Sequence, residues 1–511
     1  MSYSRRFRES LPGERPLRHP GHKRPKTRRE FLAQGFMTGA AMVMVPTLAS
    51  MLKPTRANAQ AALCGVGATA NRIPFLCFDL AGGANIAGSN VMVGGPGGQL
   101  DFLPPDGYTK LGLPTTLAPS LPLPANLRTP LAPPDALGLF FHHDSAMFAG
   151  IISKFSDPLG WAKTNGVVFC SRSENDTSNN PHNPMYGINK AGADGALVTL
   201  IGSEPSESGG NSLAPMSMID PTERPVKVDS PADVTGLVDT GRLVQLLSPQ
   251  DAASVMTAVE MISEAKLQKM NEDLIVEQLV RCGYAESSYL VSTFGNPALL
   301  DPLQDPELLS IISAGEINSS SKLRKVASAM KMVVNGFAGA GTVEGGGYDY
   351  HDGTRATGEV RDFEAGQQIG AALMYAHLKQ QQLILYVFSD GALDSDNTLD
   401  NSTAGRGKGN WRGDNQSTAA VFMLVYDPAG RPPLTKPGRQ IGYYRPSGDV
   451  ETNASRVSNN VNLLAEAIVL NFMALHNDVG RFATALPMQG LGSGAQLDAL
   501  IGFQPIRPTP P

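Results

Sequence analysis

The chain of 511 residues is poor in aromatic and charged side chains, which make up 6% and 17% of it, and it has only two tryptophans. Neither the Gly-x-Ser-x-Gly sequence of α/β-hydrolases nor the Gly-Lys-Ser/Thr sequence of P-loop nucleotidases occurs, so neither class is expected. Histidine is also scarce, with eight residues. The abundant residues are 54 glycines and 39 prolines beside 41% hydrophobic residues, which predicts a folded, loop-rich chain.

The formal net charge of −5 hides an uneven distribution along the chain. Residues 1–59 carry twelve Lys and Arg against three acids, a balance of +9. The remaining 452 residues carry 30 basic and 44 acidic side chains, a balance of −14. Because nucleic-acid binding needs a basic surface, the acidic body indicates that nucleic acid is not a partner.

The basic N-terminal segment has the pattern of an export signal. The pair Arg28-Arg29 is followed by Phe-Leu, by a weakly apolar stretch over 35–52, and by Ala57-Asn58-Ala59, the small-x-small pattern of a signal peptidase site. We therefore expect residues 1–59 to be a twin-arginine signal peptide that is removed before Gln60. The expected partners are the twin-arginine translocase and signal peptidase, and the expected location is periplasmic or extracellular.

A membrane anchor is the alternative interpretation of the same apolar stretch. The stretch is 18 residues long and is interrupted by Pro46 and Thr47. This puts it at the lower edge of the roughly 17–25 residues that a membrane-spanning helix needs. A cleaved leader is therefore favoured, which leaves no integral membrane span after cleavage.

The four cysteines, Cys64, Cys77, Cys170 and Cys282, all follow the expected cleavage site. In an oxidising compartment four cysteines permit three pairings, and the sequence does not choose among them. Leu63 stands where a lipid-attachment site needs a small residue, so Cys64 is not expected to be an acylated N-terminus.

After a spacer over 60–72, short apolar runs alternate with helical patterns over 73–480. Such runs are typical of strands covered on both faces, and their alternation with helices predicts an α/β fold with a mostly parallel sheet. A loop-rich insertion is expected over 94–135 and a Gly/Pro-rich tail over 481–511. The expected strands are Ile73–Phe78, Leu137–Phe141, Gly166–Cys170, Ala196–Ile201, Leu383–Phe388 and Ala419–Tyr426, and the expected helices include 252–262, 323–337 and 461–475.

Residue types that bind metal ions stand at or near the ends of expected strands, namely Asp79, Asp349, His351, Asp390 and Asp414. In open α/β sheets, ligands bind beyond the carboxyl ends of strands. Several carboxylates with one imidazole suit one or two divalent ions such as Zn, Mn, Mg or Ca. Each aspartate alone is more simply interpreted as a turn or cap residue, so the prediction depends on the set.

One serine has the position of a nucleophile. Ser145 precedes an apolar helix, where backbone N–H groups and the helix dipole would stabilise an attacking alkoxide and a bound phosphate. The alternative is that Ser145 only caps that helix. The polar segment 171–186 is either a substrate loop from which His182 reaches the site or a solvated loop.

The order of these motifs resembles that of a twin-arginine-exported bacterial family, domain of unknown function 1501, within the alkaline phosphatase/sulfatase superfamily. The similarity covers about 73–480 and is greatest at Gly-x-Asp-x-His over 347–351, at Ser389-Asp390 and at Gly-Asp-Asn over 413–415. It implies an alkaline-phosphatase-like α/β/α sandwich in which strand-end Asp and His residues hold two divalent metals beside a nucleophile at a helix N-terminus. It also places Asn85 and Asn415 where they suit substrate binding.

The sequence departs from the family pattern at several positions. The family's Gly-Gly-Asn-Asp loop is here Gly-Ala-Asn-Ile over 83–86, and Gly391 and Asn415 stand where histidines are expected. Because two imidazole ligands are missing, two metals, one metal or none are all open. Two functions follow. One is a metal-dependent hydrolase of phosphate or sulfate esters that uses Ser145, and the other is a non-catalytic envelope binding or structural protein of the same fold.

Replacing both Arg28 and Arg29 with lysine is expected to trap the precursor in the cytoplasm, because the twin-arginine translocase recognises the arginine pair. Cell fractionation with immunoblotting measures precursor and mature forms, and N-terminal sequencing of the exported protein should begin at Gln60. Undiminished export of the double variant would show that another route recognises the leader.

Overall fold

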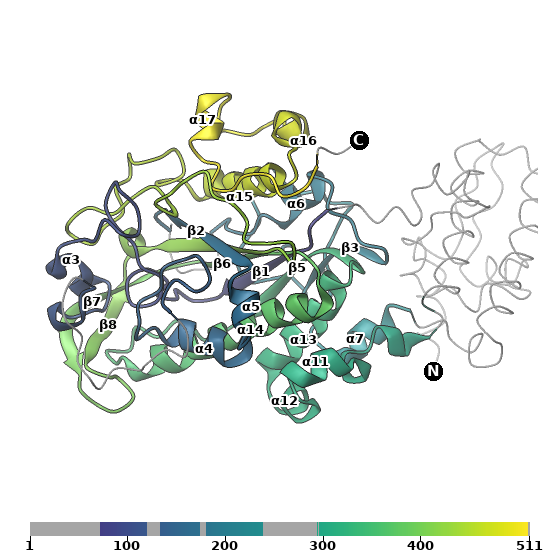
Figure 1. Ribbon diagram of the computed structural model, residues 1–511, viewed down its shortest axis with the longest axis horizontal. Helices are drawn as coiled ribbons and strands as arrows, with labels where there is room; N and C mark the ends of the chain where they lie inside the picture. Colours follow the sequence, from purple (N-terminus) through teal and green to yellow (C-terminus); the bar gives the residue numbers. More distant parts are fainter. Residues whose placement is uncertain (1–71, 120–132, 174–179, 239–293, 295, 509–511) are drawn as a thin grey trace, which may run out of the picture. The chain divides into compact units, whose positions relative to one another are not determined.

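The described part of the chain is built around an eight-stranded sheet with helices on both of its faces (Figure 1). The computed structural model describes residues 72–119, 133–173, 180–238, 294 and 296–508. The strand order is β10-β2-β9-β6-β1-β5-β3-β4, and only β9 runs antiparallel to its neighbours. The strands are β1 (Phe75–Leu80), β2 (Thr164–Cys170), β3 (Val198–Gly202), β4 (Val226–Lys227), β5 (Ala338–Gly345), β6 (Leu383–Ser389), β9 (Ala420–Tyr426) and β10 (Gln440–Ile441). The expected mostly parallel α/β architecture is therefore confirmed.

Five of the six expected strands are present, and their ends differ from expectation by at most two residues. The exception is Leu137–Phe141, which is buried but is not a strand. Within this segment only Phe141 forms a β-bridge, to Val91. Gly138 has a φ of +75°, a turn conformation that interrupts an extended chain. Hydrophobicity alone does not distinguish such a buried turn from a buried strand.

The strand β5 is central to the sheet although its sequence, Ala-Gly-Ala-Gly-Thr-Val-Glu-Gly, is not typical of a strand. The small residues are required by packing. A Cβ atom on Gly341 would lie 3.0 Å from the Val333 side chain and 3.1 Å from those of Ile201 and Leu76. Close packing therefore explains the small residues of this strand. Because the packing partners come from other segments, the strand is not recognisable from its own sequence.

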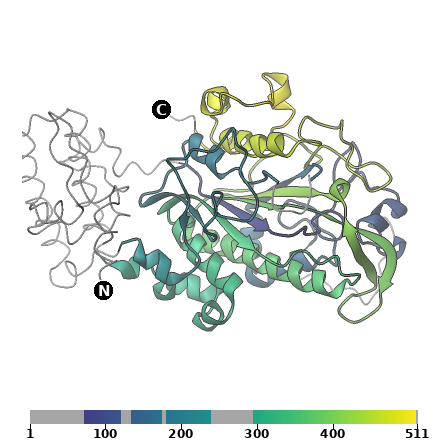
Figure 2. The ribbon, with the colours of Figure 1, turned by 180° about the vertical axis from the view of Figure 1, so that it is seen from behind.

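Helices form a layer on each face of the sheet, as the two opposite views show (Figure 1, Figure 2). On one face, α6 and α15 pack on the apolar cluster that includes Phe75 and Phe472, whose rings lie 5.9 Å apart. On the other face lie α4, α13 and α14. The expected helices over 323–337 and 461–475 correspond to α13 and α15, whereas 252–262 lies outside the described residues.

The α-helices are α3 (Pro105–Lys110), α4 (Ala146–Lys154), α5 (Pro158–Trp161), α6 (Met185–Lys190), α7 (Pro231–Gly236), α11 (Pro306–Ile311), α12 (Ala314–Ser319), α13 (Ser321–Val334), α14 (Ala356–Lys379), α15 (Val461–Leu475), α16 (Phe482–Ala485) and α17 (Ala495–Asp498). The 3-10 turns are η1 (Thr115–Leu117), η2 (Pro297–Leu299), η3 (Pro302–Gln304), η4 (Gln416–Thr418) and η5 (Val479–Arg481). None of the helices in the described part of the chain has the length and hydropathy of a membrane span.

The segment that follows α15 packs against the core instead of forming the expected tail. Phe482, Leu486, Leu500 and Phe503 are buried in the same apolar cluster as α15. Glycine and proline provide the turns between these anchors. The compositional prediction of a tail therefore overlooks the apolar residues of this segment that belong to the buried cluster.

Helices α4 and α14 approach each other unusually closely because glycines line their contact. A Cβ atom on Gly366 would lie 2.0 Å from the carbonyl oxygen of Met147, and one on Gly370 would lie 2.2 Å from that of Ile151. Gly150 faces them from α4, where a Cβ would lie 2.1 Å from the carbonyl oxygen of Phe363. The contact fixes the N-terminus of α4 against α14, which matters for the site described below.

Gly366→Ala is expected to lower the free energy of unfolding by about 1–3 kcal/mol, because the added methyl group forces two packed backbones apart. Gly236→Ala in α7 is the control, since its Cβ would meet nothing within 4 Å, and it should raise stability by up to about 1 kcal/mol. Urea denaturation measures both. Equal stability of the two variants would contradict this account of the contact.

Candidate metal centre and the buried acids beside it

The loop after β5 carries two of the expected metal ligands, Asp349 and His351. The N–H of Tyr348 donates to the carbonyl oxygen of Ala81 (3.1 Å), which holds the start of this loop against the end of β1. The backbones approach so closely here that a Cβ on Gly82 would lie 2.5 Å from the nitrogen of Asp349. The φ of Gly82, +120°, also favours glycine.

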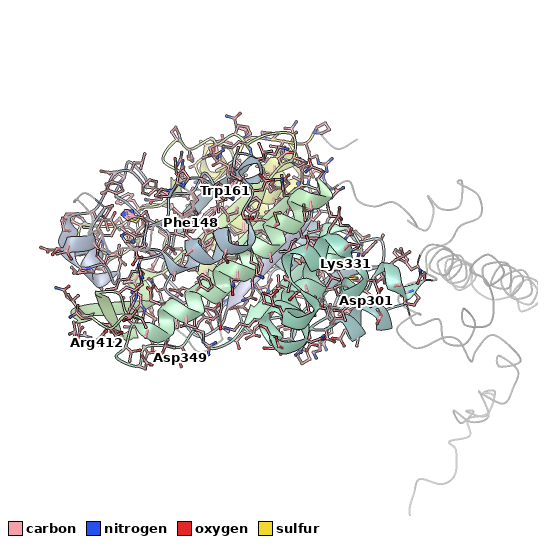
Figure 3. The ribbon with its side chains drawn as sticks, turned by 60° about the horizontal axis from the view of Figure 1, so that its bottom comes forward. Phe148, Trp161, Asp301, Lys331, Asp349 and Arg412 are labelled. Atoms are coloured by element: carbon pink, nitrogen blue, oxygen red, sulfur yellow. The ribbon has the colours of Figure 1, made fainter. Side chains whose placement is uncertain are left out.

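A two-stranded ribbon, β7 (Leu393–Asp400) with β8 (Lys408–Asp414), carries the third ligand, Asp414, at its base. The loop after β5 is hydrogen-bonded to this ribbon. The N–H of Gly353 donates to the carbonyl of Trp411, and the N–H of Trp411 donates to that of Thr354, both over 3.0 Å. Asp349 accordingly lies at the same end of the molecule as the β8 residue Arg412 (Figure 3).

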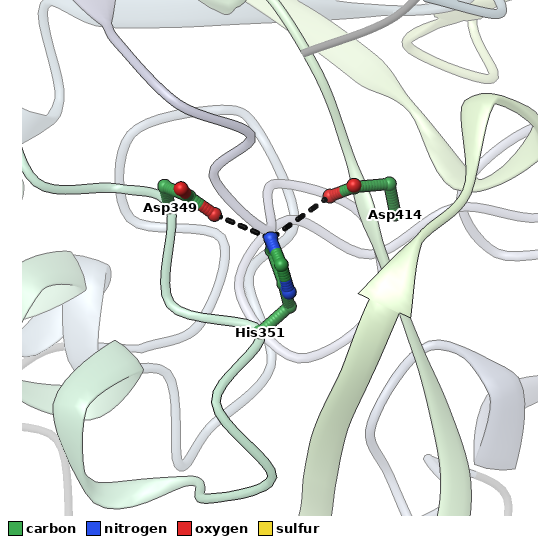
Figure 4. Close-up of side chains that lie close together, drawn as sticks. All are labelled: Asp349, His351 and Asp414. Atoms are coloured by element: carbon green, nitrogen blue, oxygen red, sulfur yellow. Dashed lines mark ion pairs between the residues drawn. The ribbon is translucent and has the colours of Figure 1, made fainter.

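The His351 imidazole lies between two carboxylates (Figure 4). Its Nε2 atom is 2.6 Å from Oδ1 of Asp349 and 3.7 Å from Oδ1 of Asp414. One potential ligand atom from each residue lies within 4.8 Å of the other two. The side chains of Asp349, His351 and Asp414 are 60%, 36% and 42% exposed, so the group is open to solvent.

This donor set fits a divalent metal ion. Two carboxylates and one imidazole are the protein ligands of many open metal sites, in which solvent or substrate completes the coordination. The Nε2 atom of His351 faces one oxygen of each carboxylate, so a cation between them would bind the nitrogen lone pair while keeping both carboxylates as neighbours. The Asp-His-Asp group, Asp349, His351 and Asp414, can therefore hold a metal ion.

Asp79 and Asp390 have other partners than the Asp-His-Asp group. Asp79 is fully buried, and its carboxylate accepts from the N–H groups of Asn211 and Ser212 (both 2.8 Å) and from the Ser212 hydroxyl (3.0 Å). Asp390 accepts from the N–H of Gly82 (2.7 Å) and from the Asn211 amide (3.0 Å). Five protein donor contacts thus occupy the carboxylate oxygens of these two expected ligands.

Burial changes the acidity of Asp79. Loss of solvent and, second to it, the neighbouring Asp390 charge raise its pKa to about 7, although the hydrogen bonds from Ser212 act in the opposite direction. A Cβ on Gly210 would lie 2.6 Å from the carboxylate, so the loop that supplies the donors fits tightly around it. The carboxyl group therefore favours its neutral form well above the usual range of aspartate.

Ser145 has the position of a helix cap. It precedes α4, is 1% exposed, and accepts a bond from the N–H of Phe148 (3.0 Å). Its hydroxyl donates to Oδ1 of Asn90 (2.8 Å). Because both bonds are internal and the group is buried, the structure gives Ser145 a capping role, the alternative considered for it from the sequence. It does not bring the hydroxyl together with the Asp-His-Asp group.

Each of the three expected substrate-binding residues has structural partners of its own. Asn85 is buried and bonds to Ser89, and Asn415 caps η4 through the N–H of Ser417 (3.0 Å). His182 is buried and stacks on Phe388 at 5.9 Å, and neither of its ring nitrogens has a hydrogen-bond partner among the described residues. Burial lowers the pKa of His182 to about 3, which keeps the imidazole neutral.

Several polar residues around the site were not identifiable from the sequence. The loop residues Asn211 and Ser212 satisfy Asp79, and Asp362 of α14 is a buried acid whose pKa burial raises to about 7. Asp362 accepts from the Tyr350 hydroxyl (2.8 Å) and the Asn90 amide (2.7 Å). The sequence contains one signal for Asp362, its place on the buried face of the helical pattern. A carboxyl group without a hydrogen-bond partner would lower the stability of the fold there.

The two cysteines that the structure describes contribute no ligand to the site. Cys77 in β1 and Cys170 in β2 are buried free thiols, and burial raises the pKa of both. Neither therefore takes part in a disulfide, whereas Cys64 and Cys282 lie outside the described residues.

In comparisons with known proteins, no protein-family model and no curated sequence matches the chain.

Asp79→Asn is expected to change how stability depends on pH. Between about pH 4 and pH 7 the unfolded chain has lost the Asp79 proton while the folded chain keeps it, so stability falls as pH rises, by roughly 1.4 kcal/mol per unit at most. Asparagine does not titrate, so the variant lacks this contribution. Urea denaturation at several pH values compares the two proteins. Parallel profiles across this range would contradict a raised pKa for Asp79.

Proposed function

We propose that the protein is an exported envelope protein of alkaline-phosphatase-like fold that binds a divalent metal ion at Asp349, His351 and Asp414 and hydrolyses a phosphate or sulfate ester there. The observation that carries the proposal is the convergence of two carboxylates and an imidazole on one solvent-open point. The ester class is supported by the resemblance of the strand-end motifs to the alkaline phosphatase/sulfatase superfamily.

The position of the three residues supports an open rather than a closed centre. They come from a loop and a ribbon at the carboxyl edge of parallel strands, where α/β proteins bind ligands. Their exposure leaves room for substrate, whereas a structural metal site is enclosed by four protein ligands. A site of this type is accessible to an ester carried by a small molecule or by an envelope polymer.

The chain's own groups would divide the chemistry as follows. When bound, the metal would polarise the ester oxygen and lower the pKa of a water molecule. Asp349 and Asp414 would hold the positive charge, and His351 would supply the lone pair of Nε2. Because Ser145 is a buried cap, the attacking group in this proposal is water and not the serine hydroxyl.

A second candidate is a non-catalytic metal-binding or structural protein of the same fold. The observation that favours it is the internal satisfaction of Asp79 and Asp390 by Asn211, Ser212 and Gly82. Two of the expected ligands are thereby engaged with protein donors. The two candidates share the Asp-His-Asp group and differ in whether anything is hydrolysed.

Titration of the mature protein with Zn²⁺, Mn²⁺, Mg²⁺ and Ca²⁺ in a calorimeter tests the metal centre. His351→Ala and Asp414→Asn should each weaken binding of the preferred ion by at least about tenfold, because each removes one of three protein ligands. Asp396→Asn is the matched control, since Asp396 is an exposed carboxylate of the same ribbon that bonds to Thr398. It should bind as the unmodified protein does.

A panel of phosphate monoesters, phosphate diesters and sulfate esters, assayed with the preferred ion, separates the two candidates. Turnover that His351→Ala abolishes and Ser145→Ala retains supports the hydrolase with water as nucleophile. Metal binding without turnover of any ester supports the non-catalytic protein. Absence of binding for all four ions would overturn the hydrolase and leave the non-catalytic structural protein.

A further inference from the structure

Tyr350 stands between the two loop ligands, Asp349 and His351, and its side chain points the other way from theirs. It is 1% exposed, whereas its two neighbours in sequence face solvent. The hydroxyl of Tyr350 donates to Oδ1 of Asp362 (2.8 Å) and accepts from the N–H of Asn85 (2.8 Å). Alternating side chains of an extended segment point in opposite directions, so an anchored Tyr350 fixes the direction of both ligands.

We propose that Tyr350 and Asp362 are positioning residues of the metal centre, and that the Tyr350–Asp362 hydrogen bond sets the placement of Asp349 and His351 toward Asp414. This inference rests on the proposed metal-binding function. It assigns to the buried acid of α14 a role in the affinity and geometry of a site that it does not touch.

Asp362 is itself held in place by a chain of hydrogen bonds that ends at α4. Its Oδ2 atom accepts from the Asn90 amide (2.7 Å), and Oδ1 of Asn90 accepts from the Ser145 hydroxyl (2.8 Å) and from the N–H of Met147 (3.2 Å). Ser145 is the cap of α4, and the glycine contact fixes α4 against α14. The hydrogen bonds of Tyr350 are therefore connected to the contact between α4 and α14.

The ring of Tyr350 also contacts the strand that leads to the third ligand. It lies 6.4 Å from the ring of Trp411 in β8, and a Cβ on Gly358 would lie 3.0 Å from the Tyr350 ring and 2.8 Å from the Trp411 nitrogen. Trp411 is three residues before Asp414 on the same strand. One buried tyrosine of the loop after β5 thus also contacts the ribbon, which supplies the third ligand.

The ligands need such an anchor because their own side chains are partly exposed, by 36–60%. Exposed side chains change rotamer freely, so the position of their backbone limits how well they converge on an ion. Groups behind the ligands of a metal site commonly affect metal affinity by about 10–100-fold. The hydroxyl of Tyr350 has the two bonds and the burial that such a role requires.

The test is the affinity for the preferred divalent ion and the visible absorption spectrum of the Co²⁺-loaded protein, measured for Tyr350→Phe. We expect affinity to fall about 10–100-fold and the Co²⁺ bands to shift, because the ligands lose their fixed placement. Tyr108→Phe is the matched control. Its buried hydroxyl likewise donates one bond, to the carbonyl of Val93 (2.8 Å), and accepts another, from the N–H of Leu103 (3.3 Å), neither of which involves the site.

Asp362→Asn supplies a second, conservative variant that does not depend on how Tyr350→Phe folds. Its amide oxygen can still accept from the Tyr350 hydroxyl, so it should keep more of the affinity than Tyr350→Phe. Wild-type affinity and spectrum in folded Tyr350→Phe, or an equal loss in Tyr108→Phe, would overturn the positioning role while leaving the metal centre intact. Absence of metal binding by the unmodified protein would overturn the proposed function itself.

Discussion

The parallel pairing of β1 with β5 on one side and with β6 on the other is the constraint on which the candidate site depends. Because these strands run in the same direction, their carboxyl ends meet at one edge of the sheet. The pairing requires small side chains in β5, because three apolar side chains occupy the space next to Gly341. At the shared edge, Gly82 donates to Asp390 and touches the backbone of Asp349, so segments more than 250 residues apart become neighbours.

Acidic side chains at this edge are accommodated in two different ways. Asp79 lies inside, where backbone and hydroxyl donors surround it and burial raises its pKa. Asp349 and Asp414 lie outside, where solvent and an imidazole balance their charge. The first arrangement stabilises a carboxyl group without any ion, and the second leaves ligand atoms available. The depth of burial of an aspartate at this edge therefore decides whether protein donors occupy its carboxylate or leave it open to a ligand.

Much of the scaffold was predictable from the sequence, because buried parallel strands and amphipathic helices leave local patterns. β6 and β9 appear as unbroken apolar runs, and α15 begins and ends where its helical period does. The turn at 137–141 and the strand β5 were not predictable. At 137–141 hydrophobicity indicates burial but does not distinguish a turn from a strand. In β5 the small residues are explained only by neighbours that are distant in sequence.

The sequence by itself determined which residues could serve as metal ligands, since Asp and His beside glycine-rich turns and apolar runs need no tertiary information to be recognised. Only the tertiary structure decided that Asp349, His351 and Asp414 converge while Asp79 and Asp390 are satisfied internally. It also decided that Ser145 is a cap and that Tyr350 and Asp362 stand behind the ligands. The physical reason is that partners and depth of burial are set by strand pairing and by helix contacts between distant segments, not by the residues adjacent in the chain.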